Sequence, residues 1–388
     1  MVAGRGVQWS PGGARRVVSA GRAGPPLMES ALRACYNNPM SDGLTRAAGS
    51  PTLEDVARVA GVSRATVSRV INGVRNVDPA IQEKVRRAVA VTGYVPNQAA
   101  RSLVTRRAGA VALVVSGAGG GADEPFPSRV FADPFFGRVA SGIVGFLRPA
   151  GVHPILMFAE TDHDRAEVVT YLRQGKADGA VLVSTHAGDP LPELLVEAAL
   201  PAVLFARPPE PIPISYVDVK HREGAALAAA HLVARGCRRV VTIAGPLAVS
   251  AAQDRLAGFR DAMAVHGQPY IPCAEGAFTL GSGEAAMEEL LAAHPDLDGV
   301  FAANDVMAQA ALRVLGEHGR RVPDDVAVVG FDDSSAALAC RPPLTTVRHP
   351  VEDMAAEMAR LLLAHIEQPD LPVTSVIFDP ALVVRESA

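Results

Sequence analysis

A short segment near residue 65 carries guanidinium and hydroxyl side chains that suit contact with DNA. Arg64 or Arg69 could donate two parallel hydrogen bonds to a guanine, and Ala65 could contact a thymine methyl group. The other polar side chains are hydroxyls, which near the start of a helix suit phosphate contacts. They are Ser63, Thr66 and Ser68. The alternative is the solvated face of an ordinary helical module.

Two short helices are predicted to hold these side chains. Thr52 caps the first helix, with Asp55 in a position like that of a capping box, and Gly61 ends it. Ser63 then caps the second helix, and its apolar face is expected to be buried. That face consists of Val67, Val70 and Ile71. The tight turn between the two helices is typical of a helix-turn-helix motif.

A third helix and a short fourth one follow. Asp78 and Pro79 begin the third helix, and Gly93 ends it. Asn97 is a good cap for a helix over 97–104, which has about two turns and is too short to be stable alone in water.

From residue 110 onward, short apolar runs alternate with amphipathic stretches of helical period. This alternation predicts an α/β fold with parallel sheets. The expected strands cover 111–115, 155–159, 180–183, 202–206, 240–244, 299–303 and 326–330. Because about 280 residues are long for one sheet, we expect two lobes. We place their boundary near the proline-rich segment 207–213, and we expect the chain to cross back near 341–350.

Charge is distributed unevenly along the 388 residues, although the formal net charge is only −4. Residues 1–50 carry +4 and residues 51–108 carry +6, whereas residues 109–388 carry −14. A basic segment joined to an acidic body indicates a nucleic-acid-binding part. Residues 1–50 lack any sustained period, and we expect them to be a disordered extension.

Composition excludes several classes of protein. No apolar stretch is long enough for a membrane span, and no secretory signal is evident. The four cysteines are scattered, which fits a reducing cytoplasm and argues against a disulfide framework. The expected location is therefore cytoplasmic, with no membrane partner.

Several motifs together resemble the lactose/galactose-repressor (LacI/GalR) family of transcription regulators. They occur in the family's order between about residues 51 and 385. They are TLEDVA at 52–57, GVSRATVSRVIN at 61–72, GYVPN at 93–97, ARSL at 100–103, DPFF at 133–136, DRLAGF at 254–259, ANDVMA at 303–308, VVGFDD at 328–333 and PLTTV at 343–347.

The resemblance implies a small all-α helix-turn-helix head (51–96), a hinge helix and linker (97–108) and a two-lobed, type I periplasmic-binding-protein-like body (109–388). It implies a homodimer on a pseudo-palindromic double-stranded operator. The hinge helix would fold on DNA, with Leu103 entering the minor groove. The implied DNA-binding residues are Thr52, Ser63, Arg64, Ala65, Thr66, Ser68, Arg69, Asn72, Tyr94, Asn97, Arg101, Leu103 and Arg106.

Ligands of open α/β sheets bind at the carboxyl ends of the strands, so the loops there supply the candidate effector site. Charged, amide and aromatic side chains in these loops suit a sugar-like polyol. They are Asp133, Phe135, Phe136, Arg207, Arg255, Phe278, Asn304 and Asp332. Each has a structural alternative: Phe136 could be core, and Asp305 beside Asn304 could cap its helix.

Departures from the family pattern leave the effector's identity open. Ala206, Ala277 and Val219 stand where sugar-responsive members often have polar side chains. Val249 stands where purine-responsive members place a ligand arginine, which argues against a purine. Both an inducer and a corepressor are compatible with the sequence.

Two other classes of protein are disfavoured. Residues 117–122 match the pattern G-x-G-x-x-A of dinucleotide-binding enzymes, but Pro125 and Pro127 are expected to prevent the helix that this motif requires. A solute-binding receptor would leave the basic head unexplained. No catalytic or metal-binding motif is evident, so we expect a non-enzymatic regulator without a cofactor.

Overall fold

The structure is a computed structural model that describes residues 51–71, 77–95, 107–117, 125–186 and 188–388. The chain divides into two compact units, Met1–Val95 and Pro96–Ala388. Several predictions fall outside the described residues. They are the extension 1–50, the hinge helix over 97–104, most of the motif at 117–122, and the roles of Asn72, Asn97, Arg101, Leu103 and Arg106.

The first unit contains the three predicted helices: α1 (Leu53–Ala60), α2 (Arg64–Ile71) and α3 (Pro79–Thr92). Their ends follow from local chemistry, because the predicted capping residues occupy the caps. Thr52 and Asp55 form a capping box at α1, and Asp78 accepts a hydrogen bond from the N–H of Ala80 at the start of α3.

Apolar side chains from all three helices form the core of the head. Val56, Val67, Val85 and Ala88 are buried there, and Tyr94 packs against them. So small a core holds the helices together while leaving most of the polar surface of α2 open to solvent.

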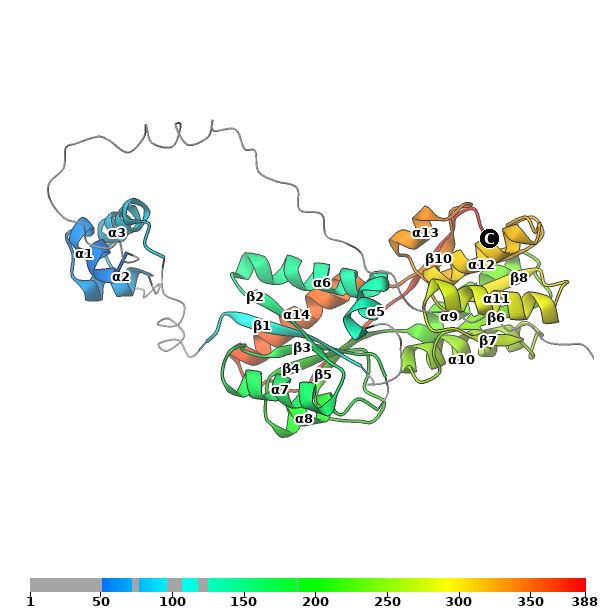
Figure 1. The fold of residues 1–388 in the computed structure, drawn as a ribbon, viewed down its shortest axis with the longest axis horizontal. Coiled ribbons are helices and arrows are strands. Elements are labelled where there is room, and N and C mark those ends of the chain that lie inside the picture. Colours follow the sequence, from blue (N-terminus) through cyan, green and yellow to red (C-terminus); the bar gives the residue numbers. More distant parts are fainter. Residues whose placement is uncertain (1–50, 72–76, 96–106, 118–124, 187) are drawn as a thin grey trace, which may run out of the picture. The chain divides into compact units, whose positions relative to one another are not determined.

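The second unit contains two six-stranded sheets, which define two lobes (Figure 1). All strands of the first sheet are parallel, in the order β11-β5-β4-β3-β1-β2. They are β1 (Ala110–Ser116), β2 (His153–Ala159), β3 (Ala180–Ser184), β4 (Ala202–Phe205), β5 (Ser215–Val219) and β11 (Ser375–Phe378).

Helices cover both faces of the first sheet (Figure 1). On one face, α6 (Pro134–Leu147) packs beside α14 (Val351–Glu367). Gly142 allows this close approach, because a Cβ there would lie 2.2 Å from the carbonyl oxygen of Glu352. The other helices of this lobe are α5 (Phe126–Ala132), η1 (Arg148–Ala150), α7 (Asp162–Arg173) and α8 (Leu191–Glu197).

The second sheet has the order β12-β10-β9-β8-β6-β7. It is parallel except for the antiparallel pairing of β12 with β10. Its strands are β6 (Val240–Ala244), β7 (Cys273–Glu275), β8 (Gly299–Ala302), β9 (Ala327–Asp332), β10 (Thr345–Arg348) and β12 (Ala381–Val383).

Two pairs of helices enclose the second sheet, and each pair buries its own apolar cluster. One pair consists of α9 (His221–Ala234) and α10 (Ser250–Val265). The other consists of α11 (Leu280–Ala293) and α12 (Asp305–Glu317), with the short α13 (Ser335–Ala339) beside α12. The predicted α/β architecture with largely parallel sheets is therefore confirmed.

The chain crosses between the lobes three times. It leaves the first lobe at Lys220, between β5 and α9, returns at residues 349–350 and crosses again at residues 379–380. The predicted boundary at 207–213 was wrong in position, because these residues join β4 to β5 within the first sheet. Prolines there form a loop between neighbouring strands and do not separate the lobes.

Two other local predictions were wrong. The prolines after residue 124 do not prevent a helix, because Pro127 lies in the first turn of α5, where a missing N–H costs little. Arg255 was expected in a loop at the carboxyl end of a strand, but α10 begins at Ser250, so Arg255 lies in the second turn of that helix.

In the described ranges, no single helix is long and apolar enough to cross a membrane. One bent pair, Phe126–Ala132 with Pro134–Ala150, passes that test by length and composition only, with an angle of 84° between its parts.

Candidate DNA-binding surface and effector site

The predicted recognition helix α2 exposes the side chains that suit DNA. Arg64, Ala65 and Arg69 are exposed, whereas Val67 on the opposite side is fully buried. The hydroxyl oxygen of Ser63 accepts the N–H of Thr66 at 3.1 Å and so caps the helix. The N-terminus of α2 therefore presents guanidinium and hydroxyl groups from a fixed helical frame.

Other predicted DNA-binding residues have structural roles in the head. Thr52 makes the capping box of α1, and Tyr94 packs against the head core. Arg64 forms an exposed ion pair with Glu54, with 3.1 Å between Nε and Oε1. An exposed pair of this kind contributes little to stability, so the guanidinium can exchange its partner for a base or a phosphate.

In the second unit, Arg255 lies at the centre of a buried polar cluster between the lobes. Its Nη1 donates to the carbonyl oxygen of Ala303 at 2.6 Å and lies 3.4 Å from Oδ1 of Asp332. Its Nε donates to Nδ1 of His221 at 3.2 Å. Its guanidinium lies 3.9 Å from the ring centroid of Phe331. Arg255 is 5% exposed, so its charge depends on these partners.

Asp332 ends β9 with a φ of 114°, in a region that L-residues rarely occupy. Burial would raise its pKa, but Arg255, His349 and Arg138 outweigh this effect and hold the pKa below its usual value. Ala206 and Phe278, which also follow strands, have positive φ as well. Strained backbone of this kind often gathers at functional sites.

Two buried histidines complete the cluster. Nδ1 of His349 lies 3.3 Å from Oδ1 of Asp332, and burial lowers the pKa of His349 to about 4. A neutral ring that donates from Nδ1 leaves Nε2 as an acceptor. Within the described part of the chain, this buried Nε2 has no hydrogen-bond partner. Nε2 of His221 lies 3.5 Å from Oδ1 of Asp218, beside the first crossing between the lobes.

Arg138 connects α6 of the first lobe to this cluster. Its Nη1 donates to the carbonyl oxygen of Asp332 at 2.9 Å, and its Nη2 donates to that of His349 at 2.9 Å. The same guanidinium makes a two-pronged pair with Glu352 on α14, at 2.7 Å for each contact. One side chain thus contacts both lobes and a crossing segment. We call Arg138, His221, Arg255, Asp332 and His349 the interlobe cluster.

Aromatic rings of the first lobe border the interlobe cluster. Phe135 stacks on His349 with ring centroids 6.1 Å apart, and it meets Phe205 edge to face at 5.1 Å. Phe136 instead packs against two apolar clusters of the first lobe, in line with the alternative that it is core. In the second lobe, Phe278 lies 6.0 Å from the Arg255 guanidinium.

Two predicted effector residues cap the N-termini of helices. Asn304 caps α12 by accepting the N–H of Met307 at 2.9 Å, and it donates to the carbonyl oxygen of Phe278 at 3.1 Å. The cap is therefore Asn304 and not Asp305. Asp133 caps α6 by accepting a hydrogen bond from the N–H of Phe135. Burial raises the pKa of Asp133 to about 6, although this hydrogen bond acts to lower it. The charges of Asp332 and Arg255 also act on the Asp133 carboxyl.

Asp305 lies beside the interlobe cluster and is almost fully buried. Its Oδ2 accepts the N–H of Ser334 at 2.7 Å, and its Oδ1 accepts the hydroxyl of Thr346 at 2.5 Å. Burial and the charge of Asp332 raise its pKa. Asp305 therefore ties the loop after β9 to β10.

Arg207 lies apart from the interlobe cluster and is well exposed. Its Nη2 donates to Oδ2 of Asp254 on α10 at 3.1 Å, which joins the first lobe to the second. Its backbone N–H donates to Asp218 at 3.3 Å. The structure thus brings Asp133, Phe135, Arg255 and Asp332 together, with Phe278 close by, and places Arg207 at a neighbouring contact between the lobes.

Sequence reasoning missed Arg138, His221 and His349 as partners of this site. His349 precedes Pro350 at a lobe crossing, and His221 follows Asp218 at a spacing of three. Either signal could have drawn attention to a junction. In the described ranges, no group of three or more metal-ligating side chains could hold a metal ion.

A helix-turn-helix head and a two-lobed α/β body with a buried polar cluster between its lobes define the class of ligand-responsive DNA-binding regulators. The family model for bacterial regulatory proteins of the lacI family matches residues 52–97. The model for the periplasmic binding protein-like domain matches residues 229–388.

Relatives and solved structures agree with both matches. The HTH-type transcriptional regulator CelR of Thermobifida fusca is 45% identical over 342 residues, which cover 87% of this chain and 98% of that protein. A solved CelR–cellobiose complex is 43% identical, with a TM-score of 0.67, and the match covers 87% and 100% of the two chains. The lac repressor dimer bound to operator and the anti-inducer ONPF is 26% identical, with a TM-score of 0.72 and coverage of 87% and 99%. The chain belongs to the lacI family of bacterial transcription regulators.

Proposed function

We propose that this protein is a homodimeric, cytoplasmic transcription repressor without enzymatic activity. Its head binds a pseudo-palindromic operator, and a sugar bound between its two lobes changes operator affinity. The division of labour follows the predicted segments: residues 51–96 bind DNA, 97–108 form the hinge and linker, and 109–388 bind the effector and dimerise. Residues 1–50 precede the head as an extension.

The observation that carries the effector proposal is the interlobe cluster. Arg255 and Asp332 place a guanidinium and a carboxylate side by side, and such planar groups suit vicinal hydroxyls. Nε2 of His349 is a buried acceptor without a partner among the described residues, and it could accept a hydrogen bond from a hydroxyl group of the ligand. Phe135 and Phe278 supply apolar surface for a sugar ring.

Cellobiose or a closely related disaccharide is the effector that we propose. The support is the solved complex of CelR with cellobiose, whose chain is 43% identical to this one over its full length. Both signs of coupling remain compatible with this proposal, because a ligand can favour either the DNA-bound or the free state.

A route for the coupling is the set of contacts that Arg138 makes. A ligand that moves Asp332 or His349 changes the carbonyl oxygens to which Arg138 donates. Because Arg138 is also paired with Glu352, such a change acts on the packing of α6 against α14. This arrangement would transmit lobe movement through the first lobe toward the hinge.

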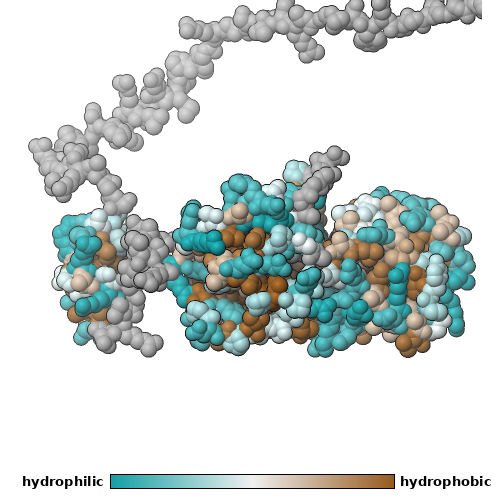
Figure 2. All heavy atoms as spheres, turned by 90° about the horizontal axis from the view of Figure 1, so that it is seen from below, coloured by the Kyte–Doolittle hydropathy of each residue, from teal (hydrophilic) through white to brown (hydrophobic). Residues whose placement is uncertain are grey.

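Exposed apolar side chains near the β2 edge of the first sheet support the proposed homodimer. Phe131 is 63%, Leu156 45% and Val144 40% exposed. Figure 2 draws the lobes from below the view of Figure 1, and on that face too brown apolar areas interrupt the polar surface. Apolar patches of this kind mark protein interfaces in many proteins.

DNA binding tests the proposal most simply. Operator fragments are selected from a random-sequence library, and binding to the full chain is measured by fluorescence anisotropy at several salt concentrations. We expect a palindromic consensus that is bound far more tightly than bulk DNA, with affinity falling steeply as salt rises. A variant lacking residues 51–108 should lose DNA binding and still bind cellobiose. Equal affinity for all sequences would overturn the proposal.

A further inference from the structure

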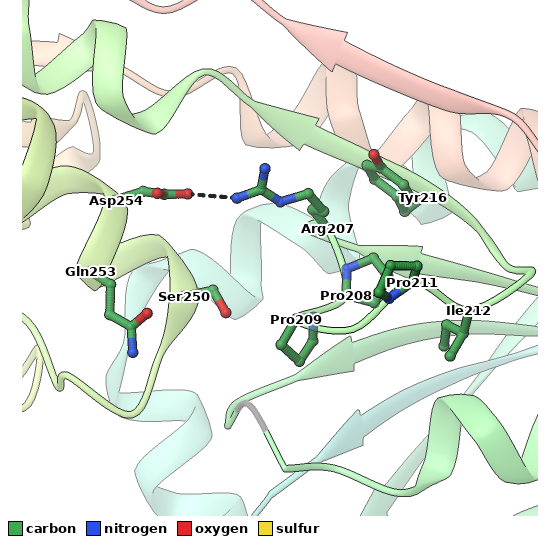
Figure 3. A pocket seen from close by; sticks show the side chains of 9 residues that line it. All are labelled: Arg207, Pro208, Pro209, Pro211, Ile212, Tyr216, Ser250, Gln253 and Asp254. Atoms are coloured by element: carbon green, nitrogen blue, oxygen red, sulfur yellow. Dashed lines mark hydrogen bonds and ion pairs between the residues drawn. The ribbon is translucent and has the colours of Figure 1, made fainter.

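The effector cleft and the linker lie at opposite ends of the first sheet. Arg207, which follows β4, pairs with Asp254 in a pocket of about 470 Å³ that belongs to this cleft (Figure 3). The cleft therefore lies at the carboxyl ends of the strands. The linker instead enters β1 at Ala110, at the amino end of the same parallel sheet. A signal from a bound ligand has to cross the first lobe to reach the predicted hinge.

Helix α14 extends across the first lobe between these two ends. Near its N-terminus, Glu352 pairs with Arg138 of the interlobe cluster. Its 17 residues span about 25 Å, and in Figure 1 it runs from the side that faces the second lobe to the end at which β1 begins. Val351 and Ile366, close to its two ends, are both buried. Because α14 is packed along its whole length, a displacement of one end is expected to displace the other.

The C-terminal end of α14 contacts the linker. Nη2 of Arg107 donates to the carbonyl oxygen of Ile366 at 2.6 Å, although the two residues are 259 positions apart in the sequence. That carbonyl is one of the last four of the helix, which have no partner within it, and the helix dipole favours a cation at this end. Arg107 thus ties the linker to the end of α14.

Asp178, which lies just before β3, holds the next two residues of the linker. Its Oδ1 accepts the N–H of Ala108 at 2.7 Å, and its Oδ2 accepts that of Gly109 at 2.8 Å. The backbone N–H of Asp178 donates to the carbonyl oxygen of Ala110 at 2.7 Å. Gly109 has a φ of 68°, which glycine adopts without strain. The chain therefore enters β1 through a turn that one carboxylate fixes to the sheet.

We infer that Arg107 and Asp178 are positioning residues that convert a displacement of α14 into a change in the direction of the linker. Asp178 holds Ala108 and Gly109 against the sheet, whereas Arg107 follows the carbonyl group of Ile366. A shift of the helix end would therefore turn the chain that leads to the predicted hinge without moving β1. The inference rests on the proposed function, since it needs a sugar that moves the lobes and a head that binds an operator.

A direct contact with DNA is the competing role of Arg107, because a basic side chain next to the predicted hinge could also neutralise a phosphate. Each phosphate contact contributes about 0.9 to the slope of log affinity against log salt concentration for double-stranded DNA. A positioning residue contributes instead to the effect of the sugar on operator affinity. The two roles therefore predict changes in two different measured quantities.

Fluorescence anisotropy of the full chain on its selected operator, with and without cellobiose and at several salt concentrations, measures both quantities. Arg107→Ala should move the ratio of the two operator dissociation constants toward one by about 2- to 30-fold. Its salt slope should change by less than about 0.4, which is under half of one phosphate contact. Arg107→Lys, whose ammonium can donate to the same carbonyl group, should recover part of the ratio.

Asp178 gives a second test that does not involve a basic side chain. Asp178→Ala removes both contacts with the linker backbone and should also move the ratio toward one. Asp178→Asn keeps one acceptor, so its ratio should lie between those of wild type and Asp178→Ala. Calorimetric titration of each free variant with cellobiose should give an affinity close to that of wild type, because the ligand site lies at the other end of α14.

Two matched controls remove the same charges elsewhere. Arg106→Ala removes the neighbouring arginine, a predicted DNA contact, and should lower the salt slope by about 0.9 while the ratio stays at the wild-type value. Asp370→Ala removes a carboxylate from an exposed position shortly after α14 and should change neither quantity.

The ratio decides the inference. A wild-type ratio in Arg107→Ala or in Asp178→Ala would overturn it while leaving the proposed function intact, and a smaller salt slope in Arg107→Ala would then identify a phosphate contact. Failure of cellobiose to change the operator affinity of wild type would overturn the proposed effector control and this inference together. A ratio closer to one in both alanine variants, with cellobiose affinity and salt slope retained, supports the inference.

Discussion

The surface of α2 and the interlobe cluster are both rich in arginine, yet the two regions use that residue in opposite ways. Arg64 and Arg69 are exposed on a helix that a small apolar core supports. Arg255 is 5% exposed and is held by an aspartate, a histidine, a carbonyl group and an aromatic ring. An exposed cation is available to a polyanion and costs the fold little, whereas a buried cation is part of the fold itself.

This difference separates binding from stability in the head and combines them in the body. A change in the head surface should alter DNA affinity at constant stability. A change in the interlobe cluster should alter stability, ligand affinity and pH dependence together.

The largest effect is expected for Arg255→Ala. Removing the guanidinium leaves Asp332 buried without its main counter-charge, so the free energy of unfolding should fall by about 3–5 kcal/mol. Cellobiose binding should fall by at least about 100-fold. Urea unfolding and calorimetry measure the two effects. Arg260→Ala, at an exposed position on the same helix, should change neither; comparable losses there would show that burial is not the cause.

The next effect is expected for Asp133→Asn, which keeps an oxygen to cap α6. Burial raises the pKa of Asp133 from 3.8 to about 6, so the folded state binds a proton that the unfolded state releases over this range. Its contribution to stability therefore falls as pH rises from about 4 to 6 and stays low above pH 6. The variant should gain up to about 3 kcal/mol over wild type above pH 6 and nothing near pH 3.

Asp164→Asn provides the opposite case for the same measurement. Hydrogen bonds from the backbone and side chain of Thr161 hold the pKa of Asp164 below its usual value. Asp164 therefore contributes stability above its unfolded pKa, and that contribution is lost as pH falls through the lower folded pKa. The substitution should destabilise the protein at neutral pH. The same pH dependence in both variants would contradict the assigned causes.

A smaller effect, and one confined to DNA binding, is expected for Arg69→Ala. If Arg69 contacts a base, operator affinity should fall by about 1–3 kcal/mol with relaxed specificity at one position. The free energy of unfolding should change by less than about 0.5 kcal/mol. Arg86→Ala on α3 removes the same charge from the head. An equal loss of affinity in both variants would show that Arg69 contributes only its positive charge and no contact with a base.

The last two substitutions remove helix caps, one in each region, and are expected to change stability locally. Thr52→Ala removes an exposed capping box and should cost about 1 kcal/mol in the head. Asn304→Ala removes a buried cap with two hydrogen bonds and should cost about 2–3 kcal/mol. Hydrogen exchange of peptides from α1 and α12 reports each loss locally. Asn304→Asp, which retains the acceptor, should recover part of the stability.

Local patterns predicted the head well and the body only in outline. The residues that begin and end the helices of the head act through their own backbone and side-chain chemistry, so the helix ends could be predicted from the sequence. These residues are Thr52, Gly61, Asp78 and Gly93. Strong apolar runs predicted seven strands. The strands β5, β7, β10, β11 and β12 were missed, because polar residues interrupt most of them and their conformation depends on pairing with neighbouring strands.

The candidate site was only half predictable for a related reason. Arg255 and Asp332 lie in motifs, but Arg138 meets the carbonyl groups of Asp332 and His349 about 200 residues away along the chain. No local period encodes such a contact. The lobe boundary failed in the same way, because prolines at 207–213 indicate a loop without indicating which strands it joins.

The effect of cellobiose on operator affinity tests most directly whether the interlobe cluster controls the head. Anisotropy titrations with and without cellobiose should show a change of about 5–150-fold in the operator dissociation constant of wild type. Arg69→Ala should bind the operator more weakly but show the same ratio, and Arg255→Ala should show a ratio near one. Cellobiose that binds wild type without changing operator affinity, or an Arg255→Ala ratio equal to that of wild type, would contradict this control.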